Sequence, residues 1–432
     1  MSTKRCQNVH PDFSPLYDCC SDFMWKAKVA GHFDLAKFHA TMEPVFKRLG
    51  FREQSASPAP SILVSYIGRA GDNILTTPML RELRRNQPQA HITFVTTSAV
   101  YSLMELCPYV DEVLHIPYLS SRQDDSFVLQ TIISFAREHL WKRHYDICIL
   151  PQWPSDNRPS RLLSYLSGSR ERWGYSDTAQ KLYAPLNIFP TDELYLLNHT
   201  ICNPPEIIHE VCRYLYMLEA MGMSVSERHT ELWLSQQDRE RAEALLTPLR
   251  RSAGDIFVAI STGAGDNSRQ YPIEKWLAAM KEITALGGRF IIIGGPSEIE
   301  NGKYLEKGLP KDTVMNLTGQ TTLRESVAII EASGLFMGND SGMMHAAAAC
   351  QRPIIAVYRE ALDKEPVATG LLSEFRRFEP YMANYIALRP EHALGDCRTA
   401  ICYGGCQSLT AHCICQVEPE EIIEAFRILT SN

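Results

Sequence analysis

A four-residue turn, Asn339-Asp340-Ser341-Gly342, interrupts an apolar run, and His345 follows it in the sequence. The apolar residues before the turn predict a strand, and the alanines after His345 predict a helix. The first turn of a helix has free backbone N–H groups and a positive dipole end, so a phosphate can bind there. Gly342 allows close approach, Ser341 offers a hydroxyl and His345 can donate to a phosphate oxygen. In the alternative interpretation, Asp340 or Ser341 only caps the helix, and His345 is an ordinary core or surface residue.

Two further turns of this kind occur earlier in the same half of the sequence. In one, Ser261 and Thr262 can bind phosphate oxygens, and Arg269 provides a fixed cation for a diphosphate. In the other, a Gly-Gly-Pro turn follows a strand, and Glu298 lies where a carboxylate could accept two ribose hydroxyls. A solvated loop and a helix-capping glutamate are the alternatives. Because all three turns fall at the ends of predicted strands, they favour a nucleotide-diphosphate site.

A fourth turn lies in the first half of the sequence, where Gly68-Arg69-Ala70-Gly71-Asp72 joins an apolar run to a helical pattern. Asp72 has two interpretations, as the N-cap of that helix or as a general base at the mouth of a cleft. A carboxylate within hydrogen-bond reach of a hydroxyl takes its proton as the new bond forms, which contributes about 10²–10⁴-fold to the rate.

These turns need a scaffold that brings strand ends together. Short β-rich runs alternate with helical patterns in both halves of the sequence, which predicts parallel sheets and an α/β fold. Ligands of such sheets bind at the carboxyl ends of the strands, so two doubly wound units facing each other leave a cleft between them. A single helix is predicted over 72–88. The predicted strands cover 61–68, 91–97, 112–118 and 146–153, then 255–262, 289–296, 313–319, 334–340 and 353–358.

The composition excludes several classes of protein. The 432 residues carry a net charge of -7, so there is no basic excess for binding nucleic acid. The N-terminus has no apolar core typical of a signal peptide, and no segment reaches ~18 apolar residues. We therefore expect a cytoplasmic protein.

The four turns, in this order, resemble those of glycosyltransferase family 9, the heptosyltransferase family, which has the GT-B fold. The segments that carry the resemblance are AGDNILTTPML, QPQAHITFVTT, CPYVDEVLHIP and NDSGMMHAAAAC, followed by Pro353. The resemblance covers residues 60–425. This chain departs from the family in its N-terminal 50 residues, which have no counterpart in a minimal heptosyltransferase, in Arg269, where the family more often has Lys, and in Ala346, where it usually has Leu.

The resemblance implies a role for each candidate residue. Asp72 would be the general base of an inverting transfer from a nucleotide-diphospho-sugar, with heptose from ADP-heptose as the first expectation. The two lobes would be Rossmann-like domains facing across a cleft. The donor would be bound by Ser261, Thr262, Arg269, Glu298, Asp340, Ser341, Gly342 and His345. Transfer would need no cofactor.

The resemblance also implies the partners. The acceptor would be a glycolipid, such as a lipopolysaccharide core sugar, or a protein hydroxyl. A lipid acceptor would place the protein at the periphery of the inner membrane, and Arg81, Arg84 and Arg85 could then face the membrane; a solvated helix face is the alternative. Two other functions stay open: another GT-B enzyme, such as a nucleotide-sugar epimerase, and a non-catalytic nucleotide-sugar-binding protein.

Cysteines gather near the C-terminus, within a segment that we place at 396–416. Such density in a reducing compartment often indicates a metal, so a structural iron or zinc is one interpretation and simple thiols are the other. The residues concerned are Cys397, Cys402, Cys406, Cys413 and Cys415. We expect three parts in the chain: a helical N-terminal extension (1–57), an acceptor-side domain (58–240) and a nucleotide-sugar-binding domain (241–432).

Overall fold

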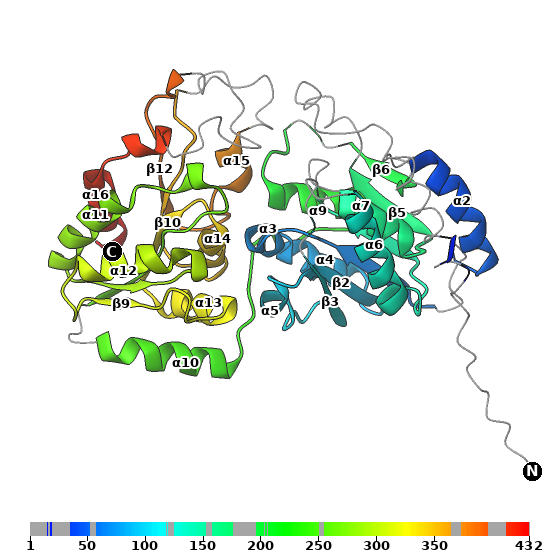
Figure 1. The fold of residues 1–432 in the computed structure, drawn as a ribbon, viewed down its shortest axis with the longest axis horizontal. Helices are drawn as coiled ribbons and strands as arrows, with labels where there is room; N and C mark the ends of the chain where they lie inside the picture. The colour runs from blue at the N-terminus through cyan, green and yellow to red at the C-terminus, as the bar shows by residue number, and fades with distance from the viewer. Residues whose placement is uncertain are drawn as a thin grey trace, which may run out of the picture.

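Two lobes, each built on a six-stranded sheet, make up the described part of the chain (Figure 1). The structure is a computed structural model. All neighbouring strands in it pair in parallel. It describes residues 15, 18–19, 35–51, 58–117, 119, 125–152, 158–175, 196–202, 204, 206–249, 255–363, 373–395 and 412–431.

Both sheets are doubly wound. The first has the order β3-β2-β1-β4-β5-β6 and the second β12-β11-β10-β7-β8-β9, so each starts in the middle, runs to one edge, returns and runs to the other. The predicted α/β class is therefore confirmed. The strands of the first sheet are β1 (Ser61–Ser65), β2 (His91–Thr97), β3 (Glu112–Ile116), β4 (Ile147–Leu150), β5 (Glu171–Tyr175) and β6 (His199–Ile201). Those of the second are β7 (Ile256–Ser261), β8 (Gly288–Ile292), β9 (Val314–Asn316), β10 (Leu335–Asn339), β11 (Ile354–Val357) and β12 (Tyr385–Leu388).

The order reverses between β1 and β4 in one sheet and between β7 and β10 in the other. Doubly wound sheets bind their ligands beyond the strand ends at such switch points. The turns after β7 and β10 begin side by side, because Gly338 pairs with Ser261 in register. A side chain at Gly338 would not fit, since its Cβ would come 2.7 Å from the Ser261 carbonyl oxygen.

Helices cover the faces of both sheets (Figure 1). Helix α10 lies along α13 and so packs with the second sheet; the domain limits themselves remain predictions. The first lobe has α2 (Leu35–Arg48), α3 (Ala70–Leu75), α4 (Thr77–Asn86), α5 (Tyr101–Met104), α6 (Asp125–Phe135), the π-helical η1 (Ala136–Leu140), α7 (Arg158–Leu166) and α9 (Glu210–Ala220). The second has α10 (Gln236–Leu246), α11 (Ile273–Ala285), α12 (Ile299–Lys307), α13 (Leu323–Ala332), α14 (Gly342–Ala349), α15 (Glu374–Phe378) and α16 (Pro419–Thr430).

The single helix predicted over 72–88 is wrong, because the chain forms α3 and α4 with a break at Thr76. Pro78 has no N–H to donate to the preceding turn, so one continuous helix would lose a hydrogen bond there. Two hydroxyls also bind the last carbonyls of α3: Thr76 Oγ1 donates to Asn73 O (2.7 Å) and Thr77 Oγ1 to Ile74 O (2.8 Å). The break leaves α3 as a short helix that points its first turn at the second lobe.

Helix α2 belongs to the predicted N-terminal extension and closes an apolar cluster of the first lobe. Phe38, Met42 and Phe46, four residues apart on one helix face, are 0% exposed. The rings of Phe38 and Phe46 lie 5.9 and 5.6 Å from that of Tyr165 on α7. This burial ties α2 to the lobe that carries Asp72.

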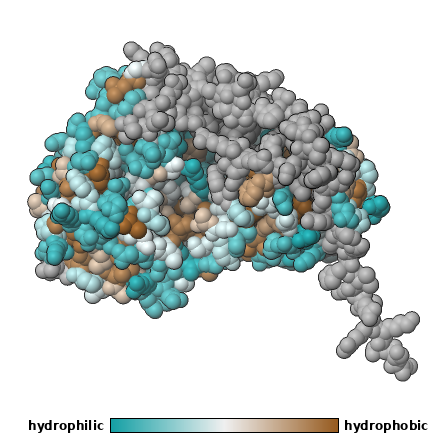
Figure 2. All heavy atoms as spheres, viewed as in Figure 1, coloured by the Kyte–Doolittle hydropathy of each residue, from teal (hydrophilic) through white to brown (hydrophobic). Residues whose placement is uncertain are grey.

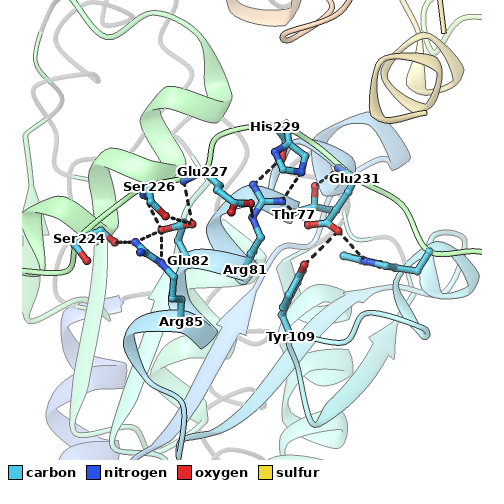
Figure 3. Close-up of polar contacts among 11 residues, drawn as sticks. Thr77, Arg81, Glu82, Arg85, Tyr109, Ser224, Ser226, Glu227, His229 and Glu231 are labelled. Atoms are coloured by element: carbon cyan, nitrogen blue, oxygen red, sulfur yellow. Dashed lines mark hydrogen bonds and ion pairs between the residues drawn. The ribbon is translucent and has the colours of Figure 1, made fainter. Parts of the chain in front are cut away.

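The segment that connects the lobes runs along α4 and is bound to it by side chains (Figure 3). Arg81 pairs with Glu231 and donates to the His229 carbonyl oxygen (2.9 Å). Arg85 binds Glu82 and the Ser224 carbonyl oxygen (3.1 Å).

Arg84 binds Asp111 (2.5 Å). All three arginines that we considered for a membrane surface therefore bind other groups of the protein, while the Arg85 side chain keeps 45% exposure, and a membrane-facing role for them stays a prediction. No described helix has the length and apolar character needed to cross a bilayer. Hydrophilic side chains prevail on the face shown in Figure 2, with apolar residues scattered among them.

Glu82 is the centre of this linker contact, so Glu82→Gln is expected to destabilise the fold. The side chain is 0% exposed and accepts from the backbone N–H groups of Ser226 (2.9 Å) and Glu227 (3.2 Å). Burial raises the pKa of Glu82, but these N–H groups and Arg85 lower it more, so the net pKa is below 4.5. Loss of the charge should cost about 2 kcal/mol of unfolding free energy.

A carboxylate with a lowered pKa stabilises the fold above its unfolded pKa and loses that effect as the pH falls through its folded pKa. The free energy of unfolding of wild type and E82Q is measured with denaturant at pH 7 and again below the folded-state pKa of Glu82. The difference in this free energy between the two proteins should be smaller at the acid pH. Glu282→Gln, at an exposed site on α11, is the matched control and should behave as wild type at both values. An E82Q protein as stable as this control would contradict the role given to Glu82.

Candidate active site

The turn after β1 places Asp72 in the first turn of α3, where the Arg69 N–H donates to Asp72 Oδ2 (3.3 Å). The side chain is half-buried. Burial and the charge of Glu210 raise the pKa of Asp72 to about 6, against opposing effects of Arg69 and Arg377. Such a carboxylate is ionised at pH 7 and still basic enough to take a proton, which suits a general base. The N-cap of α3 is Arg69, so the predicted N-cap position of Asp72 is wrong; Asp72 is the third residue of the helix and makes a capping-box contact back to the Arg69 N–H.

The turn between β10 and α14 carries unsatisfied polar groups. Ser341 is the N-cap of α14 and Gly342 its first residue. Ser341 Oγ and His345 Nδ1 are buried and have no hydrogen-bond partner among the described residues. Burial, with smaller effects of His209 and Arg269, lowers the pKa of His345 to about 3, so the imidazole is neutral at pH 7. Buried polar groups are normally paired, and here they lie at a helix N-terminus, where anions bind.

Asn339 fastens this turn to the one after β7. Its Nδ2 donates to the Thr262 carbonyl oxygen (2.7 Å), and its Oδ1 accepts from the Tyr271 N–H (3.2 Å). Asn339 is 0% exposed, and Ser261 and Thr262 are also buried. The predicted ligands of the two turns are therefore held next to each other by a residue to which we had assigned no role.

Arg269 extends from η6 (Asn267–Arg269) toward the same place. Its Nη1 lies 3.4 Å from Asp340 Oδ2, and its Nη2 pairs with Glu374 of α15. Glu374 also binds Arg359 through both carboxylate oxygens, at 3.0 and 2.8 Å. Burial lowers the pKa of Arg269, but Glu374 and Asp340 raise it more, so Arg269 is a permanent cation. Burial raises the pKa of Asp340 to about 6, although Arg269 opposes this.

Glu298 lies against the turn after β7. Its Oε2 accepts from the Gly295 N–H (2.6 Å) and its Oε1 from the Ser297 hydroxyl (2.5 Å). A methyl group at Gly263 would come 2.8 Å from the Glu298 carboxylate carbon. Glu298 therefore binds its own turn, as the capping interpretation predicts, and also lies beside the predicted phosphate turn, as the ribose interpretation requires.

Helices α3 and α14 meet where the two lobes touch (Figure 1). A methyl group on Gly71 would come 2.8 Å from His345 Cδ2, and one on Gly342 would come 3.1 Å from the Gly71 nitrogen. Arg69 Nη1 spans the same contact and donates to the Gly265 carbonyl oxygen (3.1 Å). Glycines on both sides thus let the predicted base and the predicted donor ligands approach each other.

The structure brings most of the predicted residues to one place, and their roles remain predictions. Asp72 interacts electrostatically with both Arg269 and Asp340 across the lobes. The sequence interpretation missed Glu374, which holds Arg269, and the pair formed by Glu210 and Arg377. Glu374 and Arg377 lie on one helix, but their partners Arg269 and Glu210 come from other elements far away in the sequence, so no pattern in the sequence could have paired them.

The predicted cysteine cluster is only partly described. Cys397, Cys402 and Cys406 lie outside the described residues. Cys413 Sγ accepts from the Leu394 N–H (3.4 Å), and Cys415 is half-buried. Within the described ranges, no three His, Cys, Asp or Glu side chains converge as metal ligands. The metal interpretation thus stays a prediction.

Comparison with known proteins supports the predicted family. The family model described as "Glycosyltransferase family 9 (heptosyltransferase)" matches residues 138–393. The chain is similar to lipopolysaccharide heptosyltransferase 2 of Salmonella typhimurium, with 23% identity over 302 residues that cover 69% of this chain and 82% of that protein.

Two solved structures have the same fold. A glycosyltransferase family 9 protein of Veillonella parvula has a TM-score of 0.65 at 22% identity, covering 86% of this chain and 97% of that one. An Escherichia coli ADP-heptose lipopolysaccharide heptosyltransferase II has a TM-score of 0.63 at 19% identity, covering 85% and 98%. The predicted GT-B architecture is confirmed.

Proposed function

Because this chain belongs to glycosyltransferase family 9, we propose that it is an inverting glycosyltransferase whose base is Asp72 and whose donor is a nucleotide-diphospho-sugar. One observation carries the proposal. The carboxylate of Asp72 stands on one lobe and faces, on the other, a helix N-terminus with buried unsatisfied polar atoms and a fixed cation, Arg269. A base on one side and a diphosphate site on the other are the two parts that sugar transfer to a hydroxyl requires.

On the acceptor side, Asp72 takes the proton of the attacking hydroxyl. The acceptor oxygen forms a bond to the anomeric carbon as the bond from that carbon to the diphosphate breaks on the opposite face. Attack opposite the leaving group inverts the anomeric configuration. General-base assistance of this kind contributes about 10²–10⁴-fold.

On the donor side, the leaving diphosphate gains negative charge as the bond breaks. The N–H groups at the start of α14 and the guanidinium of Arg269 are already in place to stabilise that charge. Ser341 Oγ and the neutral His345 imidazole supply further hydrogen bonds to phosphate or sugar oxygens. Glu298, beside Gly263, would accept the ribose hydroxyls.

The finer assignments rest on the relatives. Structures of similar fold include an ADP-heptose lipopolysaccharide heptosyltransferase, so we propose ADP-heptose as the donor and a lipopolysaccharide core sugar as the acceptor, with a protein hydroxyl as the other candidate. A cytoplasmic enzyme, in peripheral contact with the inner membrane where the acceptor is lipid-linked, fits this proposal. Family membership argues against the epimerase and the non-catalytic binding protein.

A donor screen tests the proposal. The purified protein is incubated with ADP-, UDP- and GDP-sugars, with and without a deacylated lipopolysaccharide core acceptor, and the products are analysed by mass spectrometry and NMR. We expect an acceptor-dependent product with inverted anomeric configuration from one donor. Sugar epimerised without consumption of acceptor would support the epimerase, and retained configuration would exclude the in-line mechanism.

Arg269→Gln is expected to weaken binding of ADP about tenfold or more, because a charge-assisted hydrogen bond to phosphate is lost. Isothermal titration calorimetry measures the affinity, and the melting temperature checks the fold. Arg269→Lys, which keeps the charge, should lose less. The control Arg241→Gln removes an arginine with 57% side-chain exposure on α10 and should leave the affinity unchanged. Equal affinity of R269Q and wild type would remove Arg269 from the donor site.

A further inference from the structure

A cluster of three buried charged side chains, Glu210, Arg213 and Arg377, joins the two lobes near Asp72. Glu210 Oε1 accepts from Arg213 Nη1 (2.9 Å) and from Arg377 Nε (2.7 Å), and Arg377 Nη2 also pairs with it. The three side chains are each at most 2% exposed. Glu210 and Arg213 lie on α9, which packs against α4 of the first lobe, whereas Arg377 lies on α15 of the second. The Glu210–Arg377 pair therefore crosses from one lobe to the other.

Such a cluster needs a reason beyond stability. Removing charges from water is costly, and apolar residues of similar size often stabilise a fold as well as a buried ion pair does. The carboxylate of Asp72 interacts electrostatically with both Glu210 and Arg377, so the cluster acts on the predicted base as well as on the fold.

Contacts place the cluster next to the base. Tyr66 and Asp72 flank the same glycine, since a Cβ at Gly68 would come 2.5 Å from Tyr66 Cε1 and 3.6 Å from Asp72 Cβ. The Tyr66 hydroxyl is hydrogen bonded to that of Tyr214 (2.8 Å). Tyr214 follows Glu210 by one turn on α9. A short path of packed groups thus connects the base with Glu210.

We propose that Arg377, from the donor-side lobe, is a positioning residue for the base on the other lobe: by pairing with Glu210 it holds the lobes together and neutralises a carboxylate that would otherwise repel ionised Asp72. The inference rests on the proposed role of Asp72 as the base. It adds that the base becomes fully competent only when the second lobe, which carries the donor site, contacts the first.

One helical turn serves both sides of the reaction. Glu374 and Arg377 are three residues apart on α15; Glu374 holds the predicted diphosphate cation Arg269, and Arg377 holds Glu210. Glu360 fixes this turn by accepting from the N–H groups of Glu374 (2.6 Å) and Phe375 (3.2 Å). A rigid α15 therefore places the cation of the donor site and the partner of Glu210 at a set separation.

Charges of both signs surround Asp72, so mutation must show which neighbouring charge favours ionised Asp72 and which disfavours it. Arg69 and Arg377 favour ionised Asp72, and Glu210 disfavours it. Among the described residues, Asp72 also interacts electrostatically with Tyr66, Tyr214, Arg269 and Asp340.

The pH dependence of kcat/KM in four proteins tests the proposal: wild type, Arg377→Gln, Glu210→Gln and the control Arg376→Gln, an exposed arginine on the same helix. Activity falls in acid as Asp72 takes a proton. R377Q removes a cation and should move this acid limb to higher pH by about one unit, whereas E210Q removes an anion and should move it to lower pH by a similar amount. R376Q should match wild type. Damage to the fold alone would not shift the limb in opposite directions, so limbs that stay in place or move together overturn the proposal.

Milder substitutions keep the test decisive if the neutral variants do not fold. Arg377→Lys and Glu210→Asp retain each charge but displace it. The acid limb of kcat/KM should therefore move to higher pH in R377K and to lower pH in E210D, by smaller amounts than in the neutral variants. Acid limbs that do not move count against the proposal. Small-angle X-ray scattering gives a readout independent of activity, because R377Q and E210Q should enlarge the radius of gyration and R376Q should not. A wild type that transfers no sugar would defeat the proposed function, while scattering would still decide whether the pair holds the lobes together.

Discussion

Asp72→Asn is expected to lower kcat/KM for sugar transfer by at least about a hundredfold, because the attacking hydroxyl loses its proton acceptor. Affinity for the nucleotide diphosphate should stay near the wild-type value, since the asparagine has the same shape and the donor ligands stand on the other lobe. Steady-state kinetics and calorimetry with ADP measure the two quantities. The combination distinguishes loss of a base from loss of binding, because a binding defect would lower both.

The same substitution should stabilise the protein at neutral pH. A carboxyl whose folded-state pKa is raised from 3.8 to about 6 binds its proton more tightly in the folded state, so its ionisation destabilises the fold as the pH rises through this interval. At 1.36 kcal/mol per unit the effect is at most about 3 kcal/mol, and water at the half-buried side chain reduces it. D72N should therefore melt at a higher temperature than wild type at pH 7 to 8, and the gain should vanish below pH 3.8.

A matched control is available on α11. Glu274 is an exposed carboxylate in the first turn of that helix, so Glu274→Gln changes charge and helix position in the same way without touching the predicted site. It should neither lower kcat/KM nor raise the melting temperature. Wild-type turnover by D72N would remove Asp72 from its assigned role, and a lower melting temperature would show that its main role is to cap α3.

The sequence was most informative where a strand is buried and a turn follows it. All nine predicted strands exist, because long apolar runs between polar turns have few other ways to be buried. The three strands that were missed lie at or near sheet edges: β5 contains Gly174 and two charged residues, β6 has three residues and β12 has four. Such short or mixed segments pair because a neighbouring strand offers hydrogen bonds, which their own pattern does not reveal.

The predicted turns meet because the doubly wound order puts the ends of β1, β7 and β10 at switch points. The side chains that connect these turns could not be predicted. Glu210 and Arg377 are separated by 167 positions, and their pairing depends on how two lobes dock. The linker partners of Arg81 and Arg85 on α4 could not be predicted for the same reason, since the linker lies about 140–150 residues later, as with Ser224 for Arg85.

Gly71→Ala is expected to lower kcat/KM about a hundredfold while preserving the fold of each lobe, because displacements near 1 Å at reacting groups have effects of that size. The added methyl would come 2.8 Å from His345 Cδ2 and 3.3 Å from Gly342 Cα. His345 is 5% exposed and packs against the ring of Phe378, 6.5 Å away, so it has little room to retreat. Either the imidazole leaves its place or the lobes separate, and both outcomes disturb the alignment of base and donor.

Alanine favours helices over glycine by about 1 kcal/mol, which offsets part of the cost of the clash, so G71A should stay folded at the assay temperature; a melting curve checks this, and loss of activity then cannot be attributed to unfolding. The control Gly334→Ala adds a methyl at the start of β10, where its nearest neighbours would be 3.5 Å away, and it should retain wild-type kinetics. Scattering of G71A should show an expanded particle if the lobes separate. Full activity in G71A would mean that α3 and α14 need not touch during transfer, and the facing of Asp72 and the α14 N-terminus would then lose its place in the mechanism.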